Sequence, residues 1–129
     1  MKTDIEITDE LYEKISKSGL MDLLNGELRK NFKRKPDSDT NDVLIGVLAN
    51  QNGKIQEAIV NVNIYIKDVV IDDQSDEDRP KLRQVMKVAS DFFEVIKYGN
   101  VRINLESQHY YSSEGEQIIN NRLLYKVKN

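Results

Sequence analysis

Apolar and polar residues alternate most regularly between residues 55 and 67, which read IQEAIVNVNIYIK. This period of two is typical of an antiparallel strand with one face buried. The apolar segment DVLIGVLA at 42–49 precedes it, and the Asn52-Gly53 pair between them predicts a β-hairpin. The apolar positions that define the buried face are Val60, Val62, Ile64 and Ile66.

A different period follows between Pro80 and Tyr98, where apolar residues recur every three or four positions. This spacing predicts a long helix with one apolar face. Pro80 suits the first turn, Asp76 or Asp78 can cap the helix, and Gly99 ends it. The predicted apolar face consists of Leu82, Val85, Met86, Ala89, Phe93 and Ile96.

A shorter helix is predicted near the N-terminus, from Thr8 or Asp9 to about Ser18, with Thr8 as a possible cap. Segment 28–35 is rich in lysine and arginine, which favours an exposed edge strand, and 36–42 is a loop by composition. Val69, Val70 and Ile71 are expected to dock on the body before the acidic run that follows them.

VRINLES at 100–107 alternates again, and a polar turn near 112–115 leads into the closing strand EQIINNRLLYKVK. The order of these elements predicts an α+β fold with a single domain over residues 1–129. It consists of an antiparallel sheet of about five strands, with the N-terminal helix and the long helix packed on one face.

The amino-acid composition of the chain argues against some classes of function and excludes some kinds of site. The chain has 129 residues, a formal net charge of −3 and no cysteine. The acidic balance argues against a general nucleic-acid binder, and disulfides and thiolate metal sites are excluded. The N-terminal decapeptide is acidic, and no apolar run approaches the ~20 residues of a membrane span. We therefore expect a cytoplasmic protein without membrane contact.

Catalytic chemistry has little support in this sequence. His109 is the single histidine and has no recognisable acid, base or nucleophile set, so we expect a loop or strand-end residue. The acidic run at 72–78 lacks the central glycine of a calcium loop, and a solvated capping run is the simpler interpretation. We expect no enzyme activity, cofactor, metal or small-molecule substrate.

The charged and aromatic segments are better candidates for a subunit interface. The basic run at 29–35 of one copy could meet the acidic run at 72–78 of the next, and opposite patches on one chain permit head-to-tail rings. The tyrosine pair at 110–111 is of the kind common at interfaces, although simple packing on the sheet explains it equally well. The candidate residues are Arg29, Lys30, Lys33, Arg34, Lys35, Asp72, Asp73, Asp76, Glu77, Asp78, Tyr110 and Tyr111.

Several segments together carry a family resemblance. They are the helix ELYEKISKSGL, the short NGELRK segment, the loop before DVLIGVLA, the strand NGKIQEAIVNVNIYIKD, the long helix and the final hairpin ending RLLYKVK. Over roughly residues 8–128 the chain resembles the tail-completion, or head–tail joining, proteins of long-tailed phages and prophages. It departs from them in the acidic segment 72–78.

The resemblance implies a non-enzymatic virion component that forms a ring on its template and contacts tail tube or head connector proteins, with no specific nucleic acid. The alternative is a small regulatory or nucleic-acid-binding α+β module that uses the basic segment 29–35, where Phe32 could stack on a base.

Overall fold

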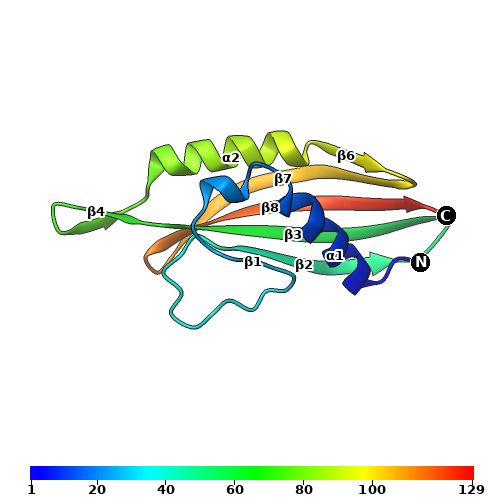
Figure 1. Ribbon diagram of the computed structural model, residues 1–129, viewed down its shortest axis with the longest axis horizontal. Helices are drawn as coiled ribbons and strands as arrows, with labels where there is room; N and C mark the ends of the chain where they lie inside the picture. Colours follow the sequence, from blue (N-terminus) through cyan, green and yellow to red (C-terminus); the bar gives the residue numbers. More distant parts are fainter.

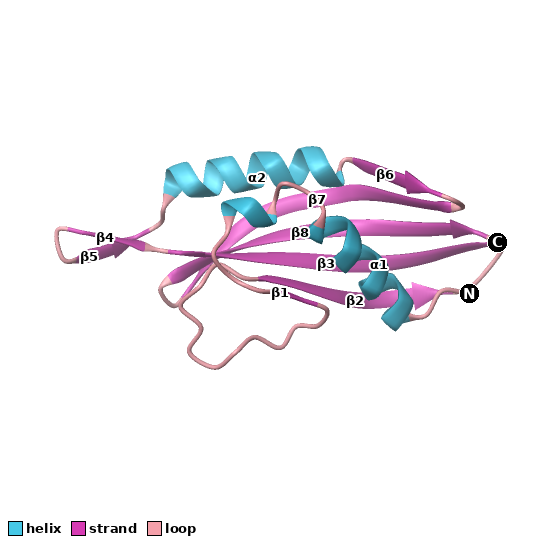
Figure 2. Cartoon of the chain, viewed as in Figure 1, coloured by secondary structure: helices cyan, strands magenta, loops and turns pink.

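The computed structural model describes residues 1–129 and shows a six-stranded sheet with both helices on one face (Figures 1 and 2). The sheet order is β1-β2-β3-β8-β7-β6, and a separate two-stranded hairpin, β4-β5, extends from one end. The elements in chain order are α1 (Asp4–Ser16), η1 (Met21–Leu23), β1 (Leu28–Arg29), β2 (Val43–Gln51), β3 (Ile55–Lys67), β4 (Val69–Ile71), β5 (Gln74–Asp76), α2 (Arg79–Phe93), β6 (Val95–Tyr98), β7 (Val101–Ser113) and β8 (Glu116–Lys128).

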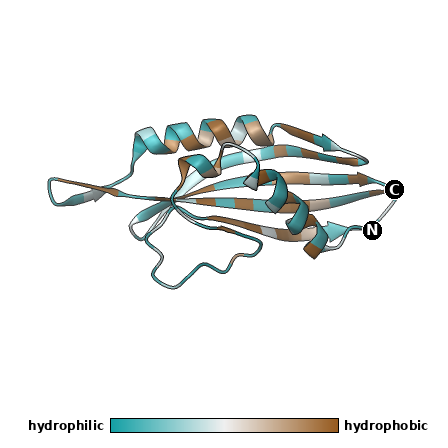
Figure 3. Ribbon diagram, in the orientation of Figure 1, coloured by the Kyte–Doolittle hydropathy of each residue, from teal (hydrophilic) through white to brown (hydrophobic).

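The pairing of β3 with β8 is the longest uninterrupted ladder in the sheet. It runs from Ile55 opposite Lys128 to Lys67 opposite Glu116 without a register shift. Figure 3 shows the alternation of apolar and polar residues along these strands. The even-numbered residues of β3 from Gln56 to Ile66 are therefore buried under the helices, as the sequence pattern predicts.

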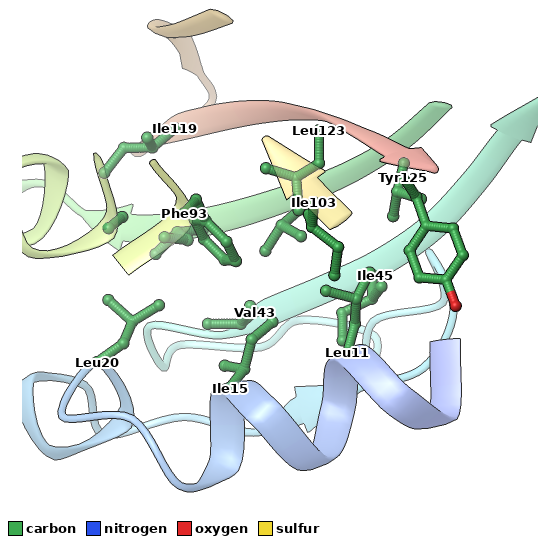
Figure 4. Packing of buried hydrophobic residues seen from close by; sticks show 14 of the residues in the cluster. Leu11, Ile15, Leu20, Val43, Ile45, Phe93, Ile103, Ile119, Leu123 and Tyr125 are labelled. Atoms are coloured by element: carbon green, nitrogen blue, oxygen red, sulfur yellow. The ribbon is translucent and has the colours of Figure 1, made fainter. Parts of the chain in front are cut away.

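Both helices contribute to one continuous core. Ile7, Leu11 and Ile15 of α1 are fully buried, and α2 supplies Leu82, Val85, Ala89 and Phe93 to the same cluster. α1 packs on β2, whereas α2 packs on β7 and β8. Figure 4 shows the α1 side chains facing β2, with Phe93 further along the same core. The predicted α+β class is confirmed, with six strands in the main sheet rather than about five.

α1 starts earlier than the sequence pattern predicts. The Thr3 hydroxyl accepts a hydrogen bond from the Glu6 N–H at 3.2 Å, and the Glu6 carboxylate accepts one from the Thr3 N–H at 3.2 Å. This reciprocal capping box fixes the helix start. Thr8, the expected cap, lies inside the helix, where its hydroxyl donates to the Asp4 and Ile5 carbonyls.

A half-buried carboxylate, Glu10, connects α1 to β6 and β8 of the sheet. Glu10 accepts hydrogen bonds from the hydroxyls of Tyr98 and Tyr125 and pairs with Lys2 at 2.9 Å. Burial raises the pKa of Glu10, but the hydrogen bonds from Tyr98, Lys2 and Tyr125 outweigh burial and leave the pKa lowered. The middle of α1 is thereby fixed to the sheet, and the half-buried Glu10 charge has a partner.

The predicted long helix is wrong at its C-terminal end. α2 ends at Phe93, and residues 95–98 form β6, which pairs with the start of β7. The two-residue turn at Gly99-Asn100 reverses the chain, and Gly99 has a φ of 52°, a left-handed conformation that suits glycine. Ile96 therefore packs against the core from a strand and not from a helix face.

The basic edge strand is also shorter than expected. β1 contains only Leu28–Arg29 and pairs in parallel with β2, and the chain from Lys30 to Asp42 is a loop. Phe32 lies against Gly46, where any larger residue would collide with its ring.

Truncation of Phe93 tests the central packing. Because this side chain is fully buried, we expect Phe93→Ala to lower the free energy of unfolding by ~3–5 kcal/mol. The matched control is Phe92→Ala, since Phe92 only packs partly against the core and its loss should cost clearly less. Urea denaturation measures both. A cost below about 1 kcal/mol for Phe93→Ala would contradict this packing.

Candidate assembly surface

The most prominent surface feature is the β4-β5 hairpin, which we call the arm (residues 68–77). It projects beyond the end of the main sheet, at the left of Figure 1, and its strands pair only with each other. Asp72 and Asp73 form its two-residue tip, with φ values of 52° and 59°. Left-handed conformation at both central residues is the geometry of a type I′ turn, and aspartate tolerates it better than most residues.

The arm exposes aliphatic side chains. Val70 is 73% exposed and Ile71 is 60% exposed, whereas Val69 is half-buried. The expected docking on the body is therefore wrong for Val70 and Ile71. The chain turns back at Asp72 before either side chain can reach the core. Val70 and Ile71 are neighbours in β4, so their side chains point to opposite faces of the hairpin and each face of the arm exposes one aliphatic side chain.

The base of the arm is firmly attached. The Asp68 N–H donates to the Gly115 carbonyl at 3.0 Å, and the Asp68 carboxylate accepts a hydrogen bond from the Gln117 side chain at 3.2 Å. The Lys67 N–H donates to the Asn41 side chain at 2.8 Å. These contacts join the arm to the β7-β8 turn and to the loop before β2.

The predicted acidic run divides into two parts. Asp76 accepts the Glu77 N–H, Asp78 caps α2 by accepting the Lys81 N–H at 3.2 Å, and Glu77 lies 3.4 Å from Arg79. Capping by Asp78 was one of the two options that the sequence offered. Asp72 and Asp73 at the tip form no ion pair within the chain.

The basic run is mostly neutralised within its own chain. Lys30 pairs with Asp9 at 2.9 Å, Lys35 pairs with Glu27 at 2.8 Å, and Arg29 lies 3.3 Å from the same glutamate. Lys33 is exposed and forms no such pair. The structure therefore gives these side chains partners that the sequence alone could not indicate.

Arg34 is the most deeply placed member of the basic run. Its guanidinium bonds to Asp42 at 2.7 Å and to Glu116 at 2.8 Å, and it donates to the Thr40 carbonyl at 2.7 Å. Its charge also lies 4.1 Å from the centre of the Tyr65 ring. With only 15% of its side chain exposed, Arg34 fixes the loop 30–42 onto the sheet and is not available to a neighbouring subunit.

Asp42 is the anionic centre of this network. It accepts further hydrogen bonds from the Ser38 hydroxyl at 2.6 Å, the Thr40 hydroxyl at 2.7 Å and the Glu27 N–H at 2.9 Å. Burial alone would raise the pKa of Asp42, but these bonds and the one from Arg34 outweigh burial and hold the pKa at about 2.

Tyr110 and Tyr111 do not form one surface, because neighbouring residues of β7 point to opposite faces of the sheet. Tyr110 lies on the helix side, with its hydroxyl 3.5 Å from an Arg79 nitrogen. Tyr111 lies on the open side, with its ring centre 6.3 Å from that of His109. His109 is exposed within the strand, opposite Asn120, rather than at the strand end.

The structure assembles no group of three histidine, aspartate or glutamate side chains that could hold a metal ion. No helix is long and apolar enough to cross a membrane. Comparison with protein-family models finds no match, and comparison with curated proteins finds no significant similarity.

The Asp42 network predicts a specific loss of stability in acid. The folded pKa of about 2 lies below the ordinary value of 3.8, so the stabilisation is complete above pH 3.8 and is lost as the pH falls toward 2. We expect about 2–3 kcal/mol of the unfolding free energy to follow this titration.

Asp42→Asn should make the unfolding free energy fall less steeply between pH 3.8 and 2. It should also destabilise the protein at neutral pH, because Arg34 loses a buried charged partner. Urea unfolding at several pH values between 2 and 7 measures both effects. Asp91→Asn is the control, since Asp91 forms an exposed helical pair with Lys87. If Asp42→Asn left the pH dependence of the unfolding free energy in acid unchanged, Asp42 would not be its cause.

Proposed function

We propose that this chain is a non-enzymatic structural protein of a phage or prophage particle that acts in tail completion or head–tail joining. In this proposal it assembles as a ring on its template and contacts tail tube or head connector proteins. The observation that carries the proposal is the arm, which presents Val70 and Ile71 to solvent from a firmly attached base. The sequence resemblance provides the biological context.

The sheet edges support assembly that depends on a template. β1 has only two residues, β2 carries an irregularity between Val47 and Ala49, and β6 has four residues including Lys97. Short, bulged and charged edges discourage spontaneous strand pairing. A free chain with such edges should remain monomeric or weakly associated, and the arm is then the element that contacts a neighbour.

The alternative, a nucleic-acid-binding module, has weaker support. Four of the five basic side chains in the run 29–35 have acidic partners inside the chain, and the net charge is −3. Phosphate neutralisation needs free cationic groups. We therefore expect at most weak, non-specific DNA affinity.

Polar substitution on the arm tests the proposed function. We expect a phage carrying Val70→Asp together with Ile71→Asp to produce filled heads and separate tails, because the aliphatic contact is lost. The thermal unfolding temperature of the purified variant should stay close to that of the native chain, since neither side chain is buried. Electron microscopy of induced lysates counts joined particles.

Ile5→Asp is the matched control, because Ile5 is 71% exposed on α1 and lies outside the arm. Normal particle joining by the arm variant would contradict the role of the arm. Normal infectious particles in the complete absence of the protein would contradict the proposed function itself.

A further inference from the structure

A small cavity lies between the start of α2 and β7. Its volume is about 190 Å³, and it is lined by Arg79, Leu82, Arg83, Met86 and Tyr110. Sites for small molecules usually measure roughly 300–1,000 Å³, so this cavity suits a single side chain. Its walls are held in place, because the Gln108 side chain donates to the Met86 carbonyl at 3.0 Å.

The cavity has an apolar interior and a positively charged rim. Met86 and the Tyr110 ring supply most of the accessible apolar surface, because the third apolar lining residue, Leu82, is almost fully buried. Two guanidinium groups stand at the rim, and Arg83 is exposed without an ion pair. Arg79 has a partner in Glu77, but at 3.4 Å with 68% of the arginine side chain exposed this pair is weak. A ligand with an aliphatic side chain followed by a carboxylate would contact the apolar lining and pair with the guanidinium groups at the rim.

The tip of the arm has this composition. Ile71 is followed directly by Asp72 and Asp73, and both carboxylates lack partners within the chain. The exposure of Ile71, 60%, shows that the tip does not occupy the cavity of its own chain. The arm projects away from the body (Figure 1), and three-residue strands reach roughly 10 Å.

We propose that the arm tip of one copy docks in the α2–β7 cavity of a second copy. Ile71 enters against Met86 and the Tyr110 ring, and the tip carboxylates approach Arg79 and Arg83. This inference rests on the proposed ring assembly and names its subunit contact. Because arm and cavity are different surfaces of one chain, the contact is heterologous and can propagate around a ring.

This contact differs from the one that the sequence predicts from charge alone. The acidic partner stays within the predicted segment 72–78, limited to its tip. The basic partner is the pair Arg79 and Arg83 on α2, because four of the five basic side chains in the run 29–35 are paired within the chain.

Disulfide trapping tests the contact in the full-length chain, which has no native cysteine. Ile71→Cys and Met86→Cys chains are mixed at high concentration under mild oxidation, and the mixed disulfide is quantified. The control pair replaces Met86→Cys with Lys87→Cys, the adjacent residue, whose side chain is 74% exposed. We expect the Met86 pair to form the mixed disulfide roughly tenfold faster, because docking raises the effective concentration.

Two further variants test the charges. Arg83→Glu in the Met86→Cys chain should reduce the rate to that of the control pair. Asp72→Asn with Asp73→Asn in the Ile71→Cys chain should do the same, because asparagine also tolerates the left-handed turn. A chain with both cysteines should give trimers and larger products, whereas products that stop at dimers would overturn the heterologous contact.

Equal rates for the Met86 and Lys87 pairs would overturn this inference. If the arm variant Val70→Asp/Ile71→Asp still blocked head–tail joining, the arm would dock on another virion protein, and the proposed function would stand. Selective trapping together with normal particles in the absence of the protein would leave the contact in place and overturn the proposed function.

Discussion

The continuous pairing of β3 with β8 is the constraint on which the rest of the structure depends. A shift of one residue would turn Asn61 and Asn63 toward the helices and Val62 and Ile64 toward the open face. Asn121, one of three buried polar residues in this ladder, is hydrogen-bonded: it donates to the Val62 carbonyl at 3.1 Å and accepts from Gln108 at 2.8 Å. This register also decides where the arm leaves the body, because β4 directly follows the end of β3.

In the proposed assembly, the charges of the protein have two separate roles. About half of the acidic and basic side chains form ion pairs within the chain, and some of these pairs fix local structure, as Arg34 does for the loop before β2. Asp72 and Asp73 remain unpaired at the tip of the arm, and Arg83 remains unpaired on α2. Assembly through these groups and one aliphatic side chain would be weak for a single contact. A template that holds several subunits together would supply the missing affinity.

Sequence patterns predicted the elements whose side chains repeat over many residues. The alternation in β3 and the apolar positions 82–93 of α2 are long enough to identify each element and its buried face. Ile96 also fits the helical period, but only the turn at Gly99-Asn100 and the pairing with β7 make it part of a strand.

The candidate site was less predictable because it depends on contacts distant in sequence. Val69–Ile71 is apolar and has the composition of a buried segment. The left-handed turn at Asp72-Asp73 instead pairs it with β5 in a hairpin that stands away from the core. Two adjacent aspartates between short segments are a weak turn signal. Arg34 pairs with Glu116, which lies 82 residues away in the sequence, so this contact could not be predicted from local patterns. The cavity on α2 requires Tyr110, which the sequence groups with Tyr111 although the two lie on opposite faces.

Amide hydrogen exchange in the free and assembled states tests the central claim most directly. The arm has short strands and exposed backbone, so residues 69–76 should exchange rapidly in the free chain, while the β3-β8 ladder exchanges slowly. On assembly, protection should rise in the arm and at the start of α2, with the ladder unchanged. An arm that stays unprotected in the assembled particle, with new protection confined to the open sheet face, would contradict the account.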